Sequence, residues 1–267
     1  WAERGIISYQ RYSGAAAAFS DLDLDGDIDL YASMFGTYDV FYANRNYDAF
    51  DKSQVGDEGD AVGIALGDYD ADGDQDVYVV NQNWRSTLWE NDIDRQIFVD
   101  VGGRSGVENH GAGTGCAFGD YDNDGDLDLY VTNYVIFDAS KIPATPNLCT
   151  FFGGIKVYCG PKGLIGAEDR LYRNEGNTQF TDVTQQSKID QSNSYYGLGV
   201  VPIDYNRDGW TDIFVANDET PNVLFKNLAD DTFSDVALLS GVAYNGDGET
   251  EAGMGVDLGD YDNDGDF

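Results

Sequence analysis

The chain has 267 residues, with 49 Asp and Glu against 15 Lys and Arg, and a net charge of −34. A surface this negative repels phosphate backbones and anionic lipid, so we expect no nucleic-acid binding. No apolar run approaches the roughly 18–20 residues of a membrane span, so we do not expect direct membrane insertion either. A single histidine and the lack of a Cys-x-x-Cys pair exclude histidine-rich metal sites and zinc ribbons. With 42% hydrophobic and 13% aromatic residues, the composition is that of a folded domain and not of a disordered acidic tail.

Much of the negative charge lies in five clusters that share one spacing. Each has Asp or Asn at positions 1, 3 and 5, Gly at position 6 and, where the chain reaches it, Asp at position 9. The clusters begin at Asp21, Asp68, Asp120, Asp204 and Asp260, and they hold 22 of the 49 acidic residues. Like charges this close repel strongly without a counter-ion. A solvated acidic loop is the alternative, but it would not repeat one spacing five times, so the pattern indicates calcium loops.

The spacing suits calcium because that ion takes about 6–8 oxygen ligands from a loop that curls around it. Glycine at position 6 permits the positive φ of the turn, position 7 offers its carbonyl, and position 9 returns a carboxylate. Magnesium demands a tighter octahedral shell and keeps its waters, so it fits less well. An EF-hand needs Glu at position 12, where this chain has Ala32, Val79, Val131 and Val215.

We therefore expect about five Ca²⁺ ions, one per loop. The expected ligand residues are Asp21, Asp23, Asp25, Asp27 and Asp29; Asp68, Asp70, Asp72, Asp74 and Asp76; Asp120, Asp122, Asp124, Asp126 and Asp128; Asp204, Asn206, Asp208, Trp210 and Asp212; and Asp260, Asp262, Asp264 and Asp266. The fourth loop has Asn206 in place of an Asp, with Arg207 and Trp210 beside it, so its ion should be the weakest. The ten positive charges of five ions would reduce the net charge from −34 to −24.

The segments around each loop predict strands. A short segment rich in Gly and small apolar residues precedes each loop, and small residues there predict close packing against a neighbouring strand. These segments are 15–19, 63–66, 115–118, 199–201 and 255–258. A β-branched and aromatic run follows each of the first four loops, in residues 30–32, 77–81, 129–133 and 213–217.

A second repeated element predicts another hairpin. It appears as Phe41–Asn44 with Phe50, Leu88–Asn91 with Phe98, Leu171–Asn174 with Phe180, and Leu224–Asn227 with Phe233. Each repeat thus supplies four strands, and the loop starts lie 47, 52, 84 and 56 residues apart. Four strands with a period near ~50 residues are typical of β-propeller blades.

These motifs, Gly-Asp-Tyr-Asp-x-Asp-Gly-Asp-x-Asp together with the pair that runs from Leu171 to Val183, resemble the FG-GAP (VCBS) repeat propellers. That class includes the integrin α-subunit propeller, and the second motif is similar to the cartilage acidic protein (ASPIC/UnbV) branch. The resemblance implies an all-β propeller of seven four-stranded blades in the complete protein, with calcium in hairpin loops on one face. In integrins that face lies opposite the ligand-binding loops. About five blades are represented here, so we expect 1–267 to be a single propeller domain, incomplete at both ends.

The 84-residue interval contains an extra segment, residues 134–168, which we expect to be an inserted loop excursion. It holds Cys149 and Cys159, for which we predict a disulfide, with two free thiols as the alternative. Cys116 aligns with apolar residues of the other repeats and is expected to be buried. Long excursions from a regular scaffold often carry binding surfaces, although a plain decorative loop is the other interpretation.

Catalytic signals are weak in this stretch. There is no Gly-x-Ser-x-Gly motif, and His110 is the one histidine, so we do not expect an enzyme. The leading hypothesis is an extracellular, secreted, cell-surface or periplasmic calcium-binding propeller. It would act as a protein-interaction, adhesion or assembly module with a protein or glycan partner at the cell surface or matrix. The alternatives are a carbohydrate-binding propeller, or the scaffold domain of a secreted lyase or oxidoreductase.

Overall fold

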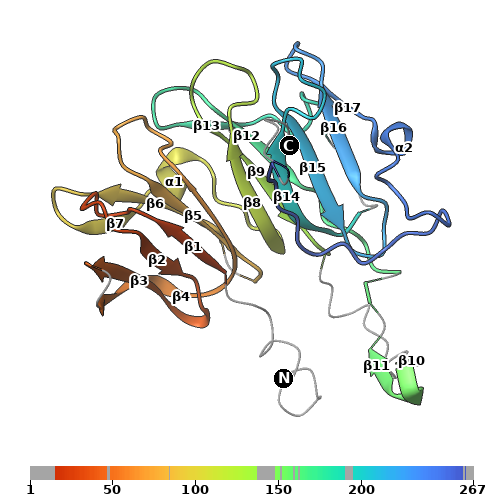
Figure 1. Cartoon of the computed structure of the whole chain (residues 1–267), viewed down its shortest axis with the longest axis horizontal. Helices are drawn as coiled ribbons and strands as arrows, with labels where there is room; N and C mark the ends of the chain where they lie inside the picture. The colour runs from red at the N-terminus through yellow and green to blue at the C-terminus, as the bar shows by residue number, and fades with distance from the viewer. Residues whose placement is uncertain are drawn as a thin grey trace.

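The computed structural model describes residues 16–46, 49–83, 85–136, 148–150, 152–158, 160–161, 163–189, 195–260 and 262. Its strands form one antiparallel sheet of seven strands, two of four strands and a separate two-stranded hairpin. We divide the seven-stranded sheet within its shared fourth strand and so describe four blades of four strands, blades 1 to 4. Figure 1 shows them side by side in chain order, from the red strands of blade 1 to the blue strands of blade 4. The expected all-β architecture of four-stranded blades is confirmed, and the count of seven blades stays a prediction.

Blades 1 and 2 share one long strand. Blade 1 contains β1 (Ala17–Ser20), β2 (Asp29–Ala32), β3 (Phe35–Arg45) and the first part of β4 (Ala49–Gly67). Blade 2 contains the rest of β4 with β5 (Asp76–Asn81), β6 (Thr87–Asp92) and β7 (Ile97–Asp100). Strand β4 pairs with β3 from Ala49 to Asp60 and with β5 from Ala61 to Gly67, so the two blades form a continuous seven-stranded sheet.

Blades 3 and 4 are separate sheets. Blade 3 contains β8 (Gly113–Gly119), β9 (Asp128–Asn133), β12 (Arg170–Asn174) and β13 (Phe180–Asp182). Blade 4 contains β14 (Gly197–Ile203), β15 (Asp212–Asn217), β16 (Val223–Asn227) and β17 (Phe233–Asp235). Two short helices, α1 (Gly102–Ser105) and α2 (Ala237–Ser240), follow the outer strands of blades 2 and 4.

The strands expected around the first four loops are all present, and every residue of β5 and of β9 is buried, as their continuous apolar runs predict. The fifth unit differs from expectation. Residues 255–258 form no strand, and no strand of the described residues pairs with them.

The inserted excursion between β9 and β12 is described in part. Its neck is closed by an isolated bridge between Val135 and Gly166, and it carries the hairpin β10 (Leu148–Thr150) and β11 (Lys156–Tyr158) with a 3-10 turn at Phe152–Gly154. Figure 1 shows this green hairpin apart from the blades. Cys149 lies in β10, whereas Cys159 lies outside the described residues, so the disulfide stays a prediction.

Neighbouring blades approach most closely along their first strands, as the small residues there predict. A Cβ atom on Gly63 would lie 3.0 Å from the Thr114 carbonyl oxygen of the next blade, and one on Gly115 would lie 2.4 Å from that of Leu198. A Cβ atom on Gly199 would lie 2.9 Å from the Met254 carbonyl oxygen. Glycine is therefore required for the close approach of these backbones and not for any unusual φ angle.

Most of the apolar core lies between blades and not within them. One buried cluster joins Tyr78 and Leu88 of blade 2 to Leu129 and Tyr172 of blade 3, and similar clusters fill the boundaries on either side. Because each sheet buries its faces against its neighbours, a blade depends on the adjacent blade for its stability.

A repeated asparagine also ties each blade to the preceding one. The side-chain NH₂ of Asn91 donates to the Leu22 carbonyl (2.8 Å), that of Asn174 to the Tyr69 carbonyl (2.7 Å), and that of Asn227 to the Tyr121 carbonyl (2.7 Å). Each accepting carbonyl belongs to position 2 of the acidic loop one blade earlier. The same NH₂ groups also donate to position 8 of their own loop, so the asparagine joins two loops at once.

A buried carboxylate holds the end of the second strand in blade 1. Asp39 is 6% exposed and accepts hydrogen bonds from the Met34 amide (2.9 Å) and the Tyr31 hydroxyl (3.1 Å). Burial raises the pKa of Asp39 to about 6, and these hydrogen bonds offset only part of that shift. Asp169 repeats the arrangement in blade 3 with the Asn133 amide and the Tyr130 hydroxyl, and desolvation raises its pKa to about 7.

Replacing Asn174 by alanine should lower the free energy of unfolding by roughly 1–3 kcal/mol, because two buried carbonyls lose their donor. Urea or thermal unfolding of the calcium-loaded protein measures this. The matched control is Asn177→Ala in the exposed turn of the same hairpin, which should change stability very little. Equal effects of the two substitutions would show that the inter-blade bond contributes nothing.

The pKa of Asp39 also predicts how stability depends on pH. The folded state holds this proton more tightly than the unfolded state does, so its contribution is complete below about pH 4 and is lost as the pH rises through about 6. At saturating calcium, Asp39→Asn should therefore flatten the fall in stability between about pH 4 and about pH 7, by on the order of 2–3 kcal/mol. Asp94→Asn, on an exposed turn, should leave the pH profile of unfolding as it is.

Candidate metal centres

Each of the first four acidic loops is shaped by its own carboxylates. At position 1, one carboxylate oxygen accepts the amide of the glycine at position 6, and at position 5 the carboxylate accepts the amide of position 7. The first bond measures 3.0 Å for Asp21, 3.0 Å for Asp68, 3.2 Å for Asp120 and 2.9 Å for Asp204. The glycines at position 6 have φ of 94°, 101°, 98° and 85°, as the loop hypothesis requires.

Position 4 of these loops also has a left-handed backbone conformation. No glycine occupies this position, so the sequence does not indicate the conformation. Leu24, Ala71, Asn123 and Arg207 have φ between 56° and 59°. Such a conformation costs on the order of 1–2 kcal/mol for residues other than Gly, Asn and Asp. The strain is held by the hydrogen bonds on either side of it, and it brings positions 1, 3 and 9 toward a common point.

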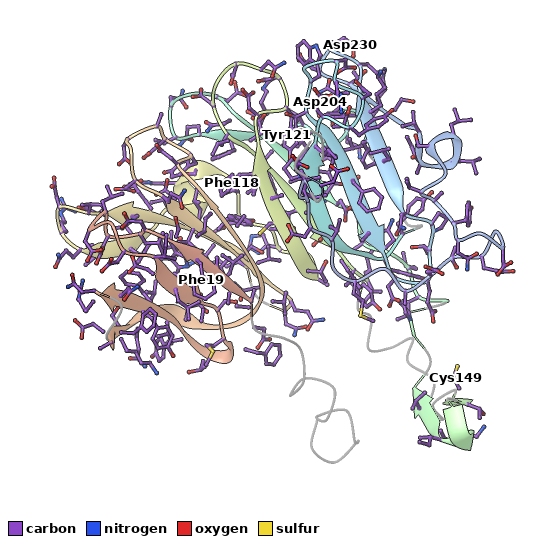
Figure 2. All side chains as sticks on the ribbon, viewed as in Figure 1. Phe19, Phe118, Tyr121, Cys149, Asp204 and Asp230 are labelled. Atoms are coloured by element: carbon purple, nitrogen blue, oxygen red, sulfur yellow. The ribbon has the colours of Figure 1, made fainter. Side chains whose placement is uncertain are left out.

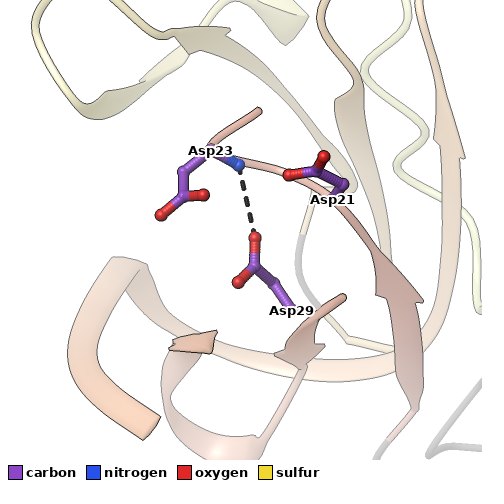
Figure 3. A group of neighbouring side chains, drawn as sticks. All are labelled: Asp21, Asp23 and Asp29. Carbon is purple, nitrogen blue, oxygen red and sulfur yellow. Dashed lines mark hydrogen bonds between the residues drawn. The ribbon is translucent and has the colours of Figure 1, made fainter. Parts of the chain in front are cut away.

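The side chains of positions 1, 3 and 9 converge in three loops. In each set one carboxylate oxygen from each residue lies within 4.8 Å of those from the other two, and the sets are Asp21, Asp23 and Asp29; Asp68, Asp70 and Asp76; and Asp120, Asp122 and Asp128. Figure 3 shows the first set, with the Asp23 amide donating to Asp29 while the three carboxylates surround one space. All nine residues are among the metal ligands that the sequence analysis predicts.

One oxygen in each of these sets lacks the partner that a buried carboxylate oxygen normally has. One oxygen each of Asp21, Asp70 and Asp120 is shielded from solvent and has no hydrogen-bond donor among the described residues. Buried polar atoms are almost always satisfied, and three converging carboxylates cannot satisfy one another. The donor set is made of hard oxygens alone, so it fits Ca²⁺ and does not fit soft transition metals.

The aspartate at position 9 connects the loop to the second hairpin. Asp76 is 1% exposed, and its two oxygens accept the Tyr69 amide (3.2 Å) and the Asn91 amide (2.9 Å). Asp128 does the same with Tyr121 and Asn174. Burial raises the pKa of Asp76 to about 8 and that of Asp128 to about 7, with the backbone hydrogen bonds lowering it in part.

Position 7 was expected to offer only its backbone carbonyl to the ion, but its side chain also has a structural role. The carboxylate of Asp27 accepts the Asn46 amide at 2.7 Å, and that of Asp74 accepts the Ile93 amide. Both amides lie in the turn of the second hairpin, so this side chain fastens the loop to that turn. Trp210 takes this position in the fourth loop and is half-buried.

Basic side chains distinguish the first and fourth loops from the others. In the fourth loop, the Asn206 amide donates to Asp212 at 3.3 Å and Lys226 pairs with Asp208 at 3.2 Å. Both contacts favour weaker cation binding there. Sequence reasoning missed the corresponding contact in the first loop, where Arg45 reaches Asp23 at 3.0 Å and Asp25 at 3.4 Å. Arg45 directly follows Asn44, one of the repeated asparagines, and this position was the sequence signal that could have indicated the contact.

The fifth loop is described only at Asp260 and Asp262, and Asp264 and Asp266 lie outside the described residues. Elsewhere, His110 lies on a loop with its side chain 70% exposed, and its Nε2 is 3.6 Å from Glu108. It is a solvated loop histidine. Cys116 is half-buried in β8, and burial raises the pKa of its thiol.

Comparison with known proteins agrees with this geometry. The family model of the FG-GAP-like repeat matches residues 68–131, 166–215 and 204–267, which together make up more than half of the chain. Cartilage acidic protein 1 of Xenopus tropicalis is 28% identical over 78% of the chain, and that of Homo sapiens is 26% identical over 93%. The chain spans 30% and 37% of the lengths of these relatives.

Among solved structures, an Agrocybe aegerita lectin that recognises non-reducing terminal N-acetylglucosamine aligns with 84% of this chain and 65% of its own, at 14% identity and a TM-score of 0.34. A superposition this loose says nothing about ligands. In the part of the chain that the structure describes, neither of the four-residue helices nor any other helix has the length and hydrophobicity of a membrane span.

The FG-GAP repeat is not a catalytic repeat, which agrees with the expectation that this stretch is not an enzyme. The acidic loops, the four-stranded blades and these matches together place the chain in the FG-GAP repeat family, where it is similar to cartilage acidic protein.

Proposed function

We propose that the chain is part of an extracellular calcium-binding propeller that serves as a protein-interaction, adhesion or assembly module. Its Ca²⁺ ions are structural, about five in number, and bind one per acidic loop. The observation that carries this proposal is the set of shielded carboxylate oxygens without donors at Asp21, Asp70 and Asp120. Carbohydrate binding, or a scaffold role in a secreted lyase or oxidoreductase, are the alternatives.

The structural role follows from what each loop is attached to. Position 9 is bonded to the second hairpin of its own blade, and the carbonyl of position 2 is bonded to the asparagine of the next blade. Without a cation, converging carboxylates repel one another and strain both attachments. A bound ion removes the repulsion, so we infer that it stabilises two blades at once.

The inserted excursion, residues 134–168, is the proposed partner surface. Its neck is fastened to blade 4, because the Tyr134 hydroxyl donates to Asp218 at 2.5 Å and the Tyr134 ring contacts Tyr196 at 5.9 Å. A rigid base of this kind presents a long loop without destabilising the scaffold. The partner class is a protein or glycan at the cell surface or in the matrix.

Calcium removal should destabilise the protein. In excess chelator we expect a lower melting temperature than in millimolar calcium, with recovery when calcium is restored, because the ion binds only the folded loops. Magnesium at the same concentration is the control and should restore much less. An unchanged melting temperature in chelator would rule out structural calcium.

The fourth loop should bind calcium most weakly, and its affinity should be adjustable. Asn206→Asp combined with Lys226→Gln removes the amide donor and the ammonium, so the weakest step in a calorimetric calcium titration should tighten about tenfold, or roughly 1.4 kcal/mol. Lys188→Gln removes the same charge from an exposed turn and is the matched control. The double variant changes the net charge by two units and the control by one, so a shift about half as large in the control would mean that only net charge matters.

A further inference from the structure

The segment that follows the outer strand takes the same course in blades 2, 3 and 4. It is helix α1 (Gly102–Ser105) in blade 2, a turn at residues 184–187 in blade 3 and helix α2 (Ala237–Ser240) in blade 4. In each segment the amide of the fourth residue, a serine, donates to the carbonyl of the valine before the segment, at 2.8, 2.8 and 2.9 Å. The three segments can therefore be compared position by position.

The following blade buries the serine of this segment and the apolar residue two positions later. Both Ser105 and Val107 of blade 2 are fully buried, and Val107 belongs to the apolar cluster shared with blade 3. In blade 3, Ser187 and Ile189 are buried in the same way, and the Ser187 carbonyl accepts the Phe233 amide of blade 4 at 2.9 Å.

In blade 4 the same two positions are Ser240 and Val242, and both are exposed. No strand of a following blade is among the described residues, so this exposure is of the kind that a following blade removes. We therefore leave these two positions out of the surface considered next.

The two middle positions of the segment behave differently, because they stay exposed even where a following blade is present. Arg104 of blade 2 has a side chain that is 56% exposed beside blade 3, and residues 185 and 186 of blade 3 are exposed beside blade 4. In blade 4 these positions are Leu238 and Leu239, which are 72% and 90% exposed. Figure 1 shows their helix, α2, at the outer edge of blade 4. A following blade thus does not account for two leucines where the other repeats have Gly, Arg and Gln.

The chain around these leucines carries negative charge alone. Residues 227–257 contain seven Asp and Glu and no Lys or Arg. Asp235 is exposed and accepts the Ala237 amide at 2.9 Å, so a carboxylate stands at the start of α2. Figure 2 shows Asp230, another of the seven, at the same end of the view as Asp204 of the fourth acidic loop. An occupant of this surface must therefore tolerate or match acidic neighbours.

This charge decides between the possible occupants. A second copy of the chain would bring two surfaces of the same sign together, and anionic lipid would be repelled in the same way. Two leucines also expose far less than the roughly 800 Å² that each partner buries in a stable interface, so they suit the anchor of a short segment.

We propose that Leu238 and Leu239 anchor a short segment of a partner protein in which apolar residues alternate with Lys or Arg. The apolar side chains of that segment pack on the two leucines, and its basic side chains face Asp235 and the other carboxylates of residues 227–257. This surface is separate from the inserted excursion and from the acidic loops. It deepens the proposed function, on which it rests for the partner being a protein.

The test uses the whole calcium-loaded chain and a fluorescent synthetic peptide of alternating leucine and lysine, with binding followed by anisotropy. The peptide should bind, and Leu238→Ser with Leu239→Ser should weaken binding roughly tenfold or more, because the anchor is lost while the charge is unchanged. A peptide with serine in place of leucine should bind the parent chain more weakly by a similar factor. A peptide with glutamate in place of lysine should not bind.

The matched control is Ile97→Ser with Leu228→Ser, which removes two exposed apolar side chains from other blade edges and should leave the dissociation constant as it is. The proposal fails if the peptide does not bind, if the two pairs of substitutions weaken binding equally, or if the serine peptide binds as tightly as the leucine peptide. It also fails if the leucines instead mediate self-association in sedimentation velocity or binding to phosphatidylcholine vesicles.

The melting temperature in calcium and in chelator is measured on every variant. Absence of peptide binding with a normal calcium response rejects this docking surface and leaves structural calcium in place. Absence of the calcium response in a parent chain that still binds the peptide rejects structural calcium and leaves the docking surface. The two proposals therefore fail separately.

Discussion

The rest of the structure depends on the aspartate at position 9 of each acidic loop. This buried carboxylate accepts one amide from its own loop and one from the repeated asparagine, so it joins the two hairpins of a blade at a single side chain. The asparagine then reaches back to the preceding loop. A carboxylate that is costly to bury thereby serves both the fold of the blade and the proposed calcium site.

The sequence was a good guide to everything that repeats. Asp at alternate positions and a glycine with positive φ predicted the loops, and β-branched runs that end at Asn predicted the buried strands. It did not reveal contacts that depend on geometry between repeats. Asn174 was visible as part of a motif, but its bond to Tyr69 spans 105 residues and needs the angle between blades. Likewise, Arg45 lies 22 residues beyond Asp23, so its contact with the first loop requires the second hairpin to fold back over that loop.

Differences among the repeats are as informative as their similarity. The boundary between blades 2 and 3 contains the ion pair of Glu90 and Arg104, while Arg173 and Gln186 stand at the same repeat positions of the next boundary. Neither the strands nor the loops change between them. Side chains at two repeat positions therefore differ between the boundaries while the strands and loops keep their arrangement, which lets one scaffold carry different surfaces.

Strand β4 has a mechanical consequence. It runs without a break from the outer edge of blade 1 to the inner edge of blade 2, so one stretch of extended backbone belongs to two hydrogen-bonded sheets. Between blades 2 and 3, by contrast, the chain passes through the short helix α1 and a loop, which can stretch before any strand separates. A pulling force applied across blades 1 and 2 has no such slack, so this pair responds as one stiff unit and yields together.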